Sequence, residues 1–150
     1  MKKVFLSVPM RNRTKENIEA SLEKMKAHTR IALGEDVEFI NTIVKETPPA
    51  NANDSVWFLG KSIQLLADAD VLVCVDCPYW LRAKGCENEK RIFQDYLIDY
   101  KKKELQYIEL PLALVMEESE FDTLREEVER NEKACCCDAP CNSKIIWKKK

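Results

Sequence analysis

Two glutamates stand where a helix is expected to begin, just after a small turn that follows an apolar, strand-like run. Glu87 and Glu89 follow Gly85 in the stretch KGCENEKRIF. The dipole and free amides of a helix N-terminus stabilise carboxylates, so a helix-starting pair is one interpretation. The same environment keeps a carboxylate ionised, and an ionised carboxylate can attack a sugar carbon or stabilise an oxocarbenium ion. Position in the sequence leaves both interpretations open.

The first turn of the chain, in the stretch SVPMRNR, is the second place with side chains suited to binding. Phosphate-binding turns between a strand and a helix usually carry glycines, which let backbone amides approach the anion. This turn has none, but Ser7, Arg11 and Arg13 stand at an expected helix N-terminus. They could hold a phosphate or a sugar hydroxyl there. An ordinary turn with solvated arginines is the alternative.

Strands and helices that alternate along the chain must position these residues. Short apolar runs predict four strands, at residues 3–8, 36–43, 70–76 and 106–115. Apolar positions at helical spacing predict helices that begin at the caps Thr14 and Asp54, the first of them ending at Gly34. Two further helices are expected, at about 87–102 and 118–133. This order predicts an α/β fold, a single doubly wound domain (flavodoxin-like or Rossmann-like) with a mostly parallel sheet.

The predicted fold indicates where a ligand would bind. In open parallel sheets ligands lie beyond the carboxyl ends of the strands, at the point where the strand order reverses. Three segments must line such a crevice: residues 7–13, residues 76–85 with the start of the third helix, and the loop preceding Asp54. Both candidate groups of side chains therefore belong to the same edge of the sheet.

Three short stretches resemble the nucleoside 2-deoxyribosyltransferase superfamily, which includes deoxynucleoside monophosphate N-glycosidases. They are VFLSVPM, LGKSIQLLADADVLV and KGCENE, within roughly residues 3–100. The superfamily typically shows Ala-Asp before an apolar strand and Gly-x-x-x-Glu opening the next helix. Ala69-Asp70 and Gly85-x-x-x-Glu89 match these patterns. The resemblance implies that Glu89 is the nucleophile, and it assigns no chemistry to Glu87.

The sequence departs from the superfamily pattern at two places. The first turn, usually rich in glycine, reads Ser7-Val8-Pro9-Met10. The glycosidase branch has an aspartate in the helix before Ala-Asp, where this chain has Ser62. A hydroxyl can hydrogen-bond a sugar but cannot act as a carboxylic acid or base. Asp76, at the end of the third strand, is the candidate for the missing acid, and capping of the loop is its alternative role.

The resemblance implies cleavage or transfer of the N-glycosidic bond of a 2-deoxynucleoside or its monophosphate, without a metal or another cofactor. It also implies a homo-oligomer. Tyr79 and Trp80 are candidates for stacking on the base, with lid packing as the alternative. The catalytic candidates are Glu89 and Asp76. The substrate-binding candidates are Ser7, Pro9, Met10, Arg11, Ser62, Tyr79, Trp80 and Gly85.

A non-catalytic module of the same fold, which binds or senses a nucleotide, is the main alternative function. Ser62 in place of an aspartate favours it, whereas Glu89 and Gly85 favour the enzyme. A third possibility is a protein–protein interaction role, with the acidic helix at 118–133 and the tail as the contact surface. Thermal stabilisation by a nucleotide separates this third role from the other two.

Composition and cysteine usage limit the remaining possibilities. The chain has 150 residues and a net charge of −2, which favours neither nucleic acid nor an anionic membrane. No apolar run is long enough to span a membrane, and we expect a cytoplasmic protein. Seven cysteines, three of them consecutive, fit a disulfide framework poorly. The α/β domain is expected at 1–134, followed by a cysteine-rich, basic tail at 135–150 whose closely spaced thiols suit zinc poorly.

Overall fold

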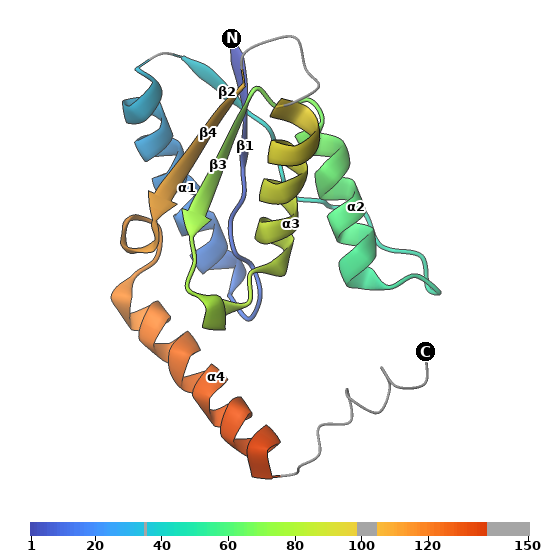
Figure 1. Ribbon diagram of the computed structural model, residues 1–150, viewed down its shortest axis with the longest axis vertical. Coiled ribbons are helices and arrows are strands. Elements are labelled where there is room, and N and C mark those ends of the chain that lie inside the picture. The colour runs from blue at the N-terminus through green and yellow to red at the C-terminus, as the bar shows by residue number, and fades with distance from the viewer. Residues whose placement is uncertain (35, 99–104, 138–150) are drawn as a thin grey trace.

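A four-stranded parallel sheet forms the centre of the protein (Figure 1). The computed structural model describes residues 1–34, 36–98 and 105–137. The strand order is β2-β1-β3-β4, and every described strand pair is parallel. This arrangement confirms the predicted α/β class with a single doubly wound sheet. The strands are β1 (Lys2–Leu6), β2 (Val37–Phe39), β3 (Val71–Asp76) and β4 (Gln106–Pro111).

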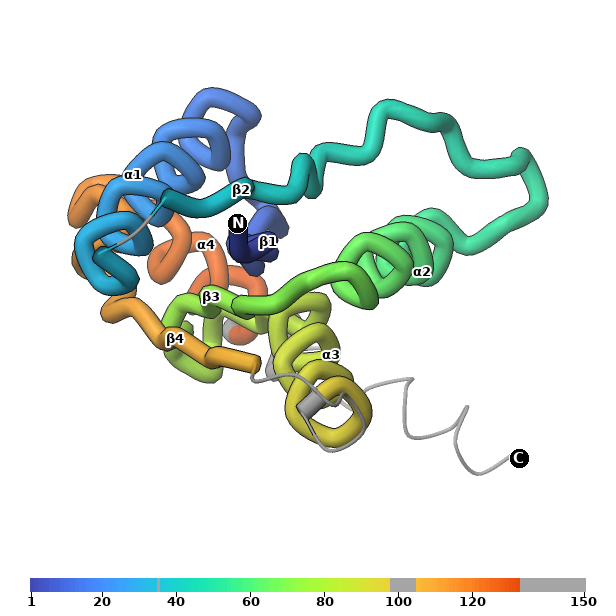
Figure 2. Tube along the Cα trace, turned by 90° about the horizontal axis from the view of Figure 1, so that it is seen from above, coloured from blue at the N-terminus to red at the C-terminus, as the bar shows by residue number. Residues whose placement is uncertain are grey.

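Helices cover both faces of the sheet, with α1 on one side and α2 and α3 on the other (Figure 2). A fourth helix, α4, begins beyond the carboxyl end of β4 and extends away from the sheet (Figure 1). The helix α3 continues as a π-helix over Phe93–Ile98. The α-helices are α1 (Lys15–Leu33), α2 (Asp54–Leu66), α3 (Lys84–Ile92) and α4 (Glu118–Cys137).

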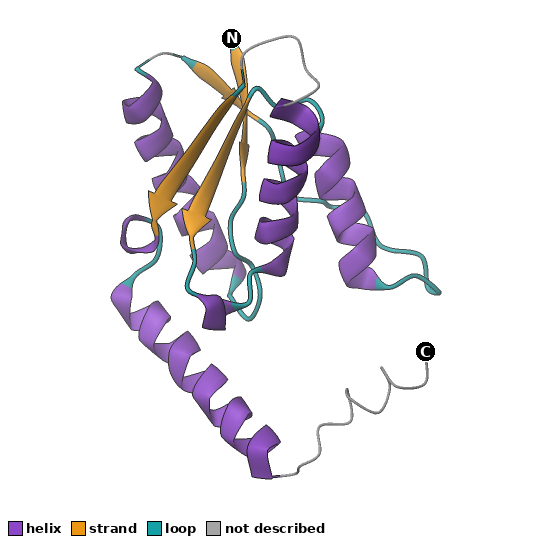
Figure 3. Ribbon diagram, in the orientation of Figure 1, coloured by secondary structure: helices purple, strands orange, loops and turns teal. Residues whose placement is uncertain are grey.

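The two faces of the sheet are packed by alternate residues of the same strands. In β1, Val4 and Leu6 belong to the core beneath α1, whereas Phe5 belongs to the core beneath α2 and α3. In β3 the residues Val71, Val73 and Val75 face α1, and Leu72 and Cys74 face the other way. Successive side chains of a strand point to opposite faces, so a strand buried on both sides reads as a continuous apolar run. Figure 3 shows β3 and β4 ending on the side of the sheet where α3 begins.

The helix boundaries follow local capping chemistry, and two of them differ from the sequence prediction. The Thr14 side chain accepts a hydrogen bond at the start of α1, and Gly34 ends this helix at a φ of 62°, as predicted. The predicted cap Asp54 is wrong, because the Asn53 side chain accepts the hydrogen bond from the Val56 amide at 3.1 Å. The helix α3 begins at Lys84, earlier than expected, and Ala83 before it has no capping side chain to mark the start.

Strand and tail boundaries differ in a similar way. The strand β1 ends at Leu6, two residues earlier than expected, and β2 has only three residues. Pro111 is the last residue of β4, and a 3₁₀ turn follows it at Leu112–Leu114. The helix α4 extends through Cys137, beyond the expected boundary at residue 134. The rest of the tail, including Cys141, lies outside the described residues. In the described part of the chain, no helix combines the length and apolar character that a bilayer crossing requires.

Candidate functional site

A cavity of about 730 Å³ lies at the carboxyl edge of the sheet, between the end of β1, the helix α2 and the start of α3. The connections after β1 and β3 lead to opposite faces of the sheet, and these two strands are neighbours. The cavity is therefore beside the point where the strand order reverses, the expected ligand position in this fold. Six predicted site residues line it: Pro9, Met10, Arg11, Ser62, Gly85 and Glu89.

Glu89 is the buried carboxyl group in the wall of this cavity. It is only 8% exposed, and burial raises its pKa from 4.5 to about 7. The helix N-terminus therefore does not keep this carboxylate fully ionised at neutral pH, contrary to the sequence-based expectation. Because α3 begins at Lys84, Glu87 rather than Glu89 is in the first turn. Desolvation therefore outweighs the helix dipole at this position.

Ser7 lies beside Glu89 at the end of β1. It is 1% exposed and does not belong to the cavity lining. Its hydroxyl approaches the Glu89 carboxyl and favours the ionised form. This contact lowers the pKa of Glu89, but by less than burial raises it. Neither Ser7 Oγ nor Glu89 Oε2 reaches hydrogen-bond geometry with any described residue. Two buried polar atoms without partners thus lie next to the cavity, which is uncommon in folded proteins.

Three positively charged side chains also line the cavity. Arg11, Arg82 and Lys84 all contribute to the lining, and all three residues are exposed. Among the described residues of the lining, Glu89 is the only acidic one. This charge distribution favours an anionic ligand whose neutral part reaches the buried carboxyl group.

The helix α2 supplies an apolar wall that the sequence analysis missed. Phe58 and Val56 both line the cavity, and Val56 is 67% exposed. Only Leu66 of this helix is buried. Helical spacing identifies an apolar face but does not distinguish packing in the core from a cavity wall, which is why these residues were missed.

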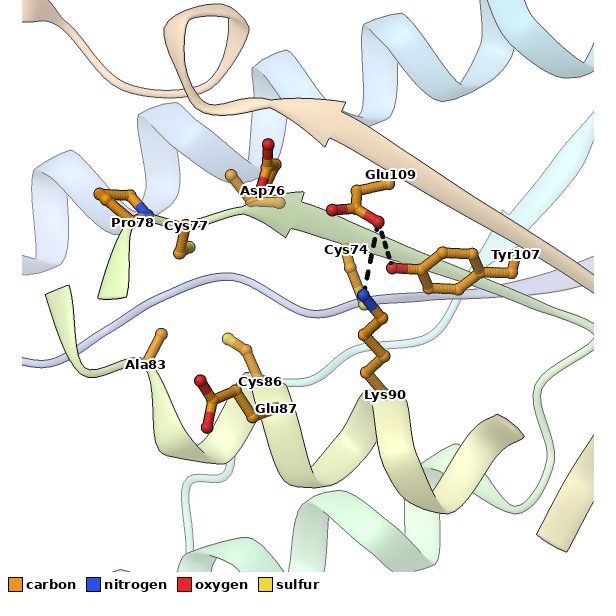
Figure 4. A pocket seen from close by; sticks show the side chains of 11 residues that line it. Cys74, Asp76, Cys77, Pro78, Ala83, Cys86, Glu87, Lys90, Tyr107 and Glu109 are labelled. Carbon is orange, nitrogen blue, oxygen red and sulfur yellow. Dashed lines mark hydrogen bonds and ion pairs between the residues drawn. The ribbon is translucent and has the colours of Figure 1, made fainter. Parts of the chain in front are cut away.

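Asp76 lies in a second, smaller cavity of about 160 Å³ between β3, β4 and α3 (Figure 4). It does not line the larger cavity, so the structure does not bring it together with Glu89. Glu109 accepts hydrogen bonds from Tyr107 Oη at 2.8 Å and from Lys90 Nζ at 3.5 Å in the same small cavity. Glu87 also lines this cavity, away from the lining that contains Glu89.

Three thiols lie around the small cavity, and Cys86 belongs to both linings. Burial raises the pKa of Cys74 to about 12 and that of Cys77 to about 11, and it also raises the pKa of Cys86. Thiols with raised pKa values stay protonated at neutral pH and are poor nucleophiles and metal ligands. Within the described ranges, no group of three or more histidine, cysteine or acidic side chains is arranged to hold a metal ion.

The two aromatic candidates of the loop after β3 lie outside the larger cavity. Tyr79 is 93% exposed. Trp80 packs edge-on against Phe121 of α4, with 5.1 Å between ring centroids, next to a cluster that includes Leu81 and Met116. The packing alternative thus describes Trp80 in this structure, and neither residue is placed to stack on a ligand next to Glu89.

No protein-family model, curated protein or solved structure matches this chain.

Proposed function

We propose that the protein cleaves or transfers the N-glycosidic bond of a 2-deoxynucleoside or its monophosphate, with Glu89 as the nucleophile. The observation that carries the proposal is a carboxyl group, 8% exposed, in the wall of a cavity of about 730 Å³ at the carboxyl edge of a parallel sheet. The volume is within the range of small-molecule sites, roughly 300–1,000 Å³. The resemblance of KGCENE and two other stretches to the nucleoside 2-deoxyribosyltransferase superfamily supports the same residue and the same reaction.

The reaction follows from the chemistry of the carboxylate. Ionised Glu89 attacks the anomeric carbon, and the base leaves with the electrons of the carbon–nitrogen bond and takes up a proton from solvent water. The resulting glycosyl ester is resolved by water in hydrolysis, or by a second base in transfer. The water or second base that attacks the glycosyl ester releases a proton to solvent, which balances the reaction. A pKa of about 7 keeps a substantial fraction of Glu89 ionised at neutral pH. Because Asp76 lies in the neighbouring cavity, the proposal does not depend on it as the acid.

The positive charges support a monophosphate as the preferred substrate. Arg11, Arg82 and Lys84 line the same cavity as Glu89 and are exposed, so a phosphate can reach them while remaining solvated. Arginine and lysine are the side chains that most often bind phosphate. Ser62 lines the cavity from α2, and its hydroxyl supports the proposal because it can hydrogen-bond a sugar hydroxyl.

The proposal is tested by incubating the protein with the four 2-deoxynucleosides and their 5′-monophosphates and quantifying free base by chromatography. We expect base release by the wild type and its loss in the Glu89→Gln variant, which keeps the shape but removes the nucleophile. Glu87→Gln is the matched control, because Glu87 is on the same helix but lines the other cavity. Base release that survives in Glu89→Gln contradicts the assignment of Glu89.

A nucleotide-binding module without turnover is the second candidate. The observation that favours it is the lack of a second acidic residue among the described lining of the larger cavity, where Ser62 takes the place of an aspartate. This function predicts thermal stabilisation by deoxynucleotides without release of free base. Stabilisation that persists in Glu89→Gln, together with an inactive wild type, selects the binding module.

We further propose that the protein is a homo-oligomer in the cytoplasm. The exposed apolar side chains of Val56 and Met10, both in the lining of the cavity, support a contact surface that includes this lining. The free thiols of Cys74, Cys77 and Cys86 are consistent with a reducing compartment. Analytical ultracentrifugation at micromolar concentration tests the oligomer, and a single species with the mass of one chain contradicts it.

A further inference from the structure

Ser7 occupies a fixed position at the reversal point of the sheet. Its backbone N–H donates to the Val73 carbonyl at 2.9 Å, which continues the pairing of β1 with β3 by one residue. The residue is 1% exposed, so its side chain is fully enclosed. The backbone position is therefore rigid, and the hydroxyl proton is the part of the residue that is free to turn.

The Ser7 hydroxyl and the Glu89 carboxyl are a potential hydrogen-bond donor and acceptor that both lack a partner. Ser7 Oγ and Glu89 Oε2 are both buried, and neither has a partner among the described residues. Leaving a buried polar atom without a hydrogen bond costs roughly 1–3 kcal/mol, and more when the atom is charged. A serine hydroxyl donates one hydrogen bond, and an ionised carboxylate can only accept. Each atom is thus the natural partner of the other once Glu89 is ionised.

We propose that Ser7 is a positioning residue for Glu89, and this inference rests on the proposed function. The Ser7 hydroxyl donates to Oε2 of the ionised carboxylate and leaves Oε1 directed at the cavity. Oε1 then forms the bond to the anomeric carbon while the carbon–nitrogen bond breaks and its electron pair leaves with the base. Oε2 becomes the carbonyl oxygen of the ester and keeps the hydrogen bond. Attack by water or a second base on the anomeric carbon returns Oε1 to the carboxylate.

The other groups that face Glu89 do not supply this contact. Cys86 on α3 and Cys74 on β3 interact electrostatically with Glu89, and their raised pKa values keep both thiols neutral. The helix α2 contributes two polar side chains to the cavity, Ser55 and Ser62, and no charged one. The cations of the lining, Arg11, Arg82 and Lys84, are exposed, whereas Oε2 is buried. Ser7 is the described residue whose side chain favours the ionised form of Glu89.

The test is a titration of the Glu89 carboxyl carbon by NMR in four proteins: wild type, Ser7→Ala, Ser7→Thr and Ser62→Ala. We expect the midpoint to rise by about one pH unit in Ser7→Ala, because the donor to the ionised form is lost. Ser7→Thr keeps a hydroxyl and should retain the wild-type midpoint. Ser62→Ala removes a hydroxyl from another wall of the cavity and should not move it. Ser7→Cys, which fills the same space with a weak donor, replaces Ser7→Ala if the alanine variant does not fold.

The kinetic consequence separates positioning from a structural role. In Ser7→Ala, kcat should fall by about tenfold with little change in KM, and the acid limb of kcat/KM should move to higher pH by the same amount as the NMR midpoint. A midpoint in Ser7→Ala equal to that of the wild type overturns the role of Ser7, whatever the activity. If the wild type releases no base but the midpoint is still shifted in Ser7→Ala, the proposed function is overturned and the Ser7–Glu89 hydrogen bond is supported.

Discussion

At the scale of single residues, burial of the Glu89 carboxyl group lowers the stability of the folded protein wherever this group is ionised. Its folded-state pKa of about 7 is above its usual value of 4.5, so between these two pH values the folded protein binds more protons than the unfolded chain. Stability must then fall as the pH rises through this interval, since the unfolding free energy decreases wherever the folded state binds more protons. Below pH 4.5 the cost is absent, and above pH 7 it is complete.

The first prediction is that Glu89→Gln is more stable than the wild type at pH 8 by about 3 kcal/mol, and that the difference disappears near pH 4. The neutral amide has no ionised form to bury, so only the wild type loses this stability. Urea denaturation at several pH values measures the difference, and Glu87→Gln is the control that should follow the wild type. If the unfolding free energies of Glu89→Gln and the wild type change in parallel with pH, the result contradicts a buried carboxyl group with a raised pKa at position 89.

At the scale of elements, α4 is held against the first turn by a buried ion pair. The Arg13 side chain is fully buried and binds Glu120 through Nε at 2.5 Å and Nη2 at 3.1 Å. The same guanidinium donates to the Pro9 carbonyl at 2.8 Å and to the Ser21 hydroxyl at 2.6 Å. Pro9 lines the larger cavity, so Arg13 connects α4, α1 and the cavity wall. The sequence analysis offered Arg13 as a ligand contact or a solvated side chain, and its structural role corrects both interpretations.

A second prediction concerns this ion pair. Glu120→Gln should destabilise the protein by about 3 kcal/mol or more, because it leaves a buried guanidinium without its counter-charge. Glu129→Gln is the matched control on the same helix, since Glu129 is 55% exposed and pairs with Arg125 at 3.3 Å. Exposed pairs contribute only about 0.5 kcal/mol. Equal urea midpoints for the two variants contradict a central role for Arg13.

At the scale of the whole molecule, the topology assembles one cavity from segments that are distant in the sequence. The connection after β1 brings Arg11, the connection after β3 brings Arg82 and Lys84, and α2 closes the remaining side. The parallel strands place these connections at one edge, because all carboxyl ends point the same way. Positive charge from two separate connections therefore converges on one volume.

A third prediction follows from this convergence. The double variant Arg11→Gln/Arg82→Gln should bind deoxynucleoside monophosphates about tenfold or more weakly, because each charged contact to a phosphate contributes roughly 1 kcal/mol or more. Binding of the unphosphorylated deoxynucleosides should change little. Isothermal titration measures both, with Arg91→Gln as the control, because Arg91 is an exposed residue of α3 that belongs to neither cavity lining. An equal loss for nucleosides and monophosphates would show that the two arginines do not bind phosphate.

The sequence by itself determined the elements and the two segments that are proposed to carry the chemistry. Apolar runs identify strands buried on both faces, Thr14 and Gly34 mark the ends of α1, and the alternation of strands and helices limits the fold to a parallel sheet. These features are local or periodic, and they depend on a few neighbouring residues. The turn after β1 and the Gly85–Glu89 segment were recognised for the same reason.

Only the tertiary structure decided how these parts meet. The strand order brings Ser7 beside Glu89 and leaves Asp76 in a different cavity, and no local pattern contains that information. The exposure of Val56 and the burial of Arg13 depend on what lies opposite each side chain. The spacing of apolar residues identifies the apolar face of a helix, but it does not show which part of the protein packs against that face. The raised pKa of Glu89 has the same origin. Desolvation is produced by all the groups that surround a carboxyl, and the cavity lining that contains Glu89 is built from β1, α2 and α3 together.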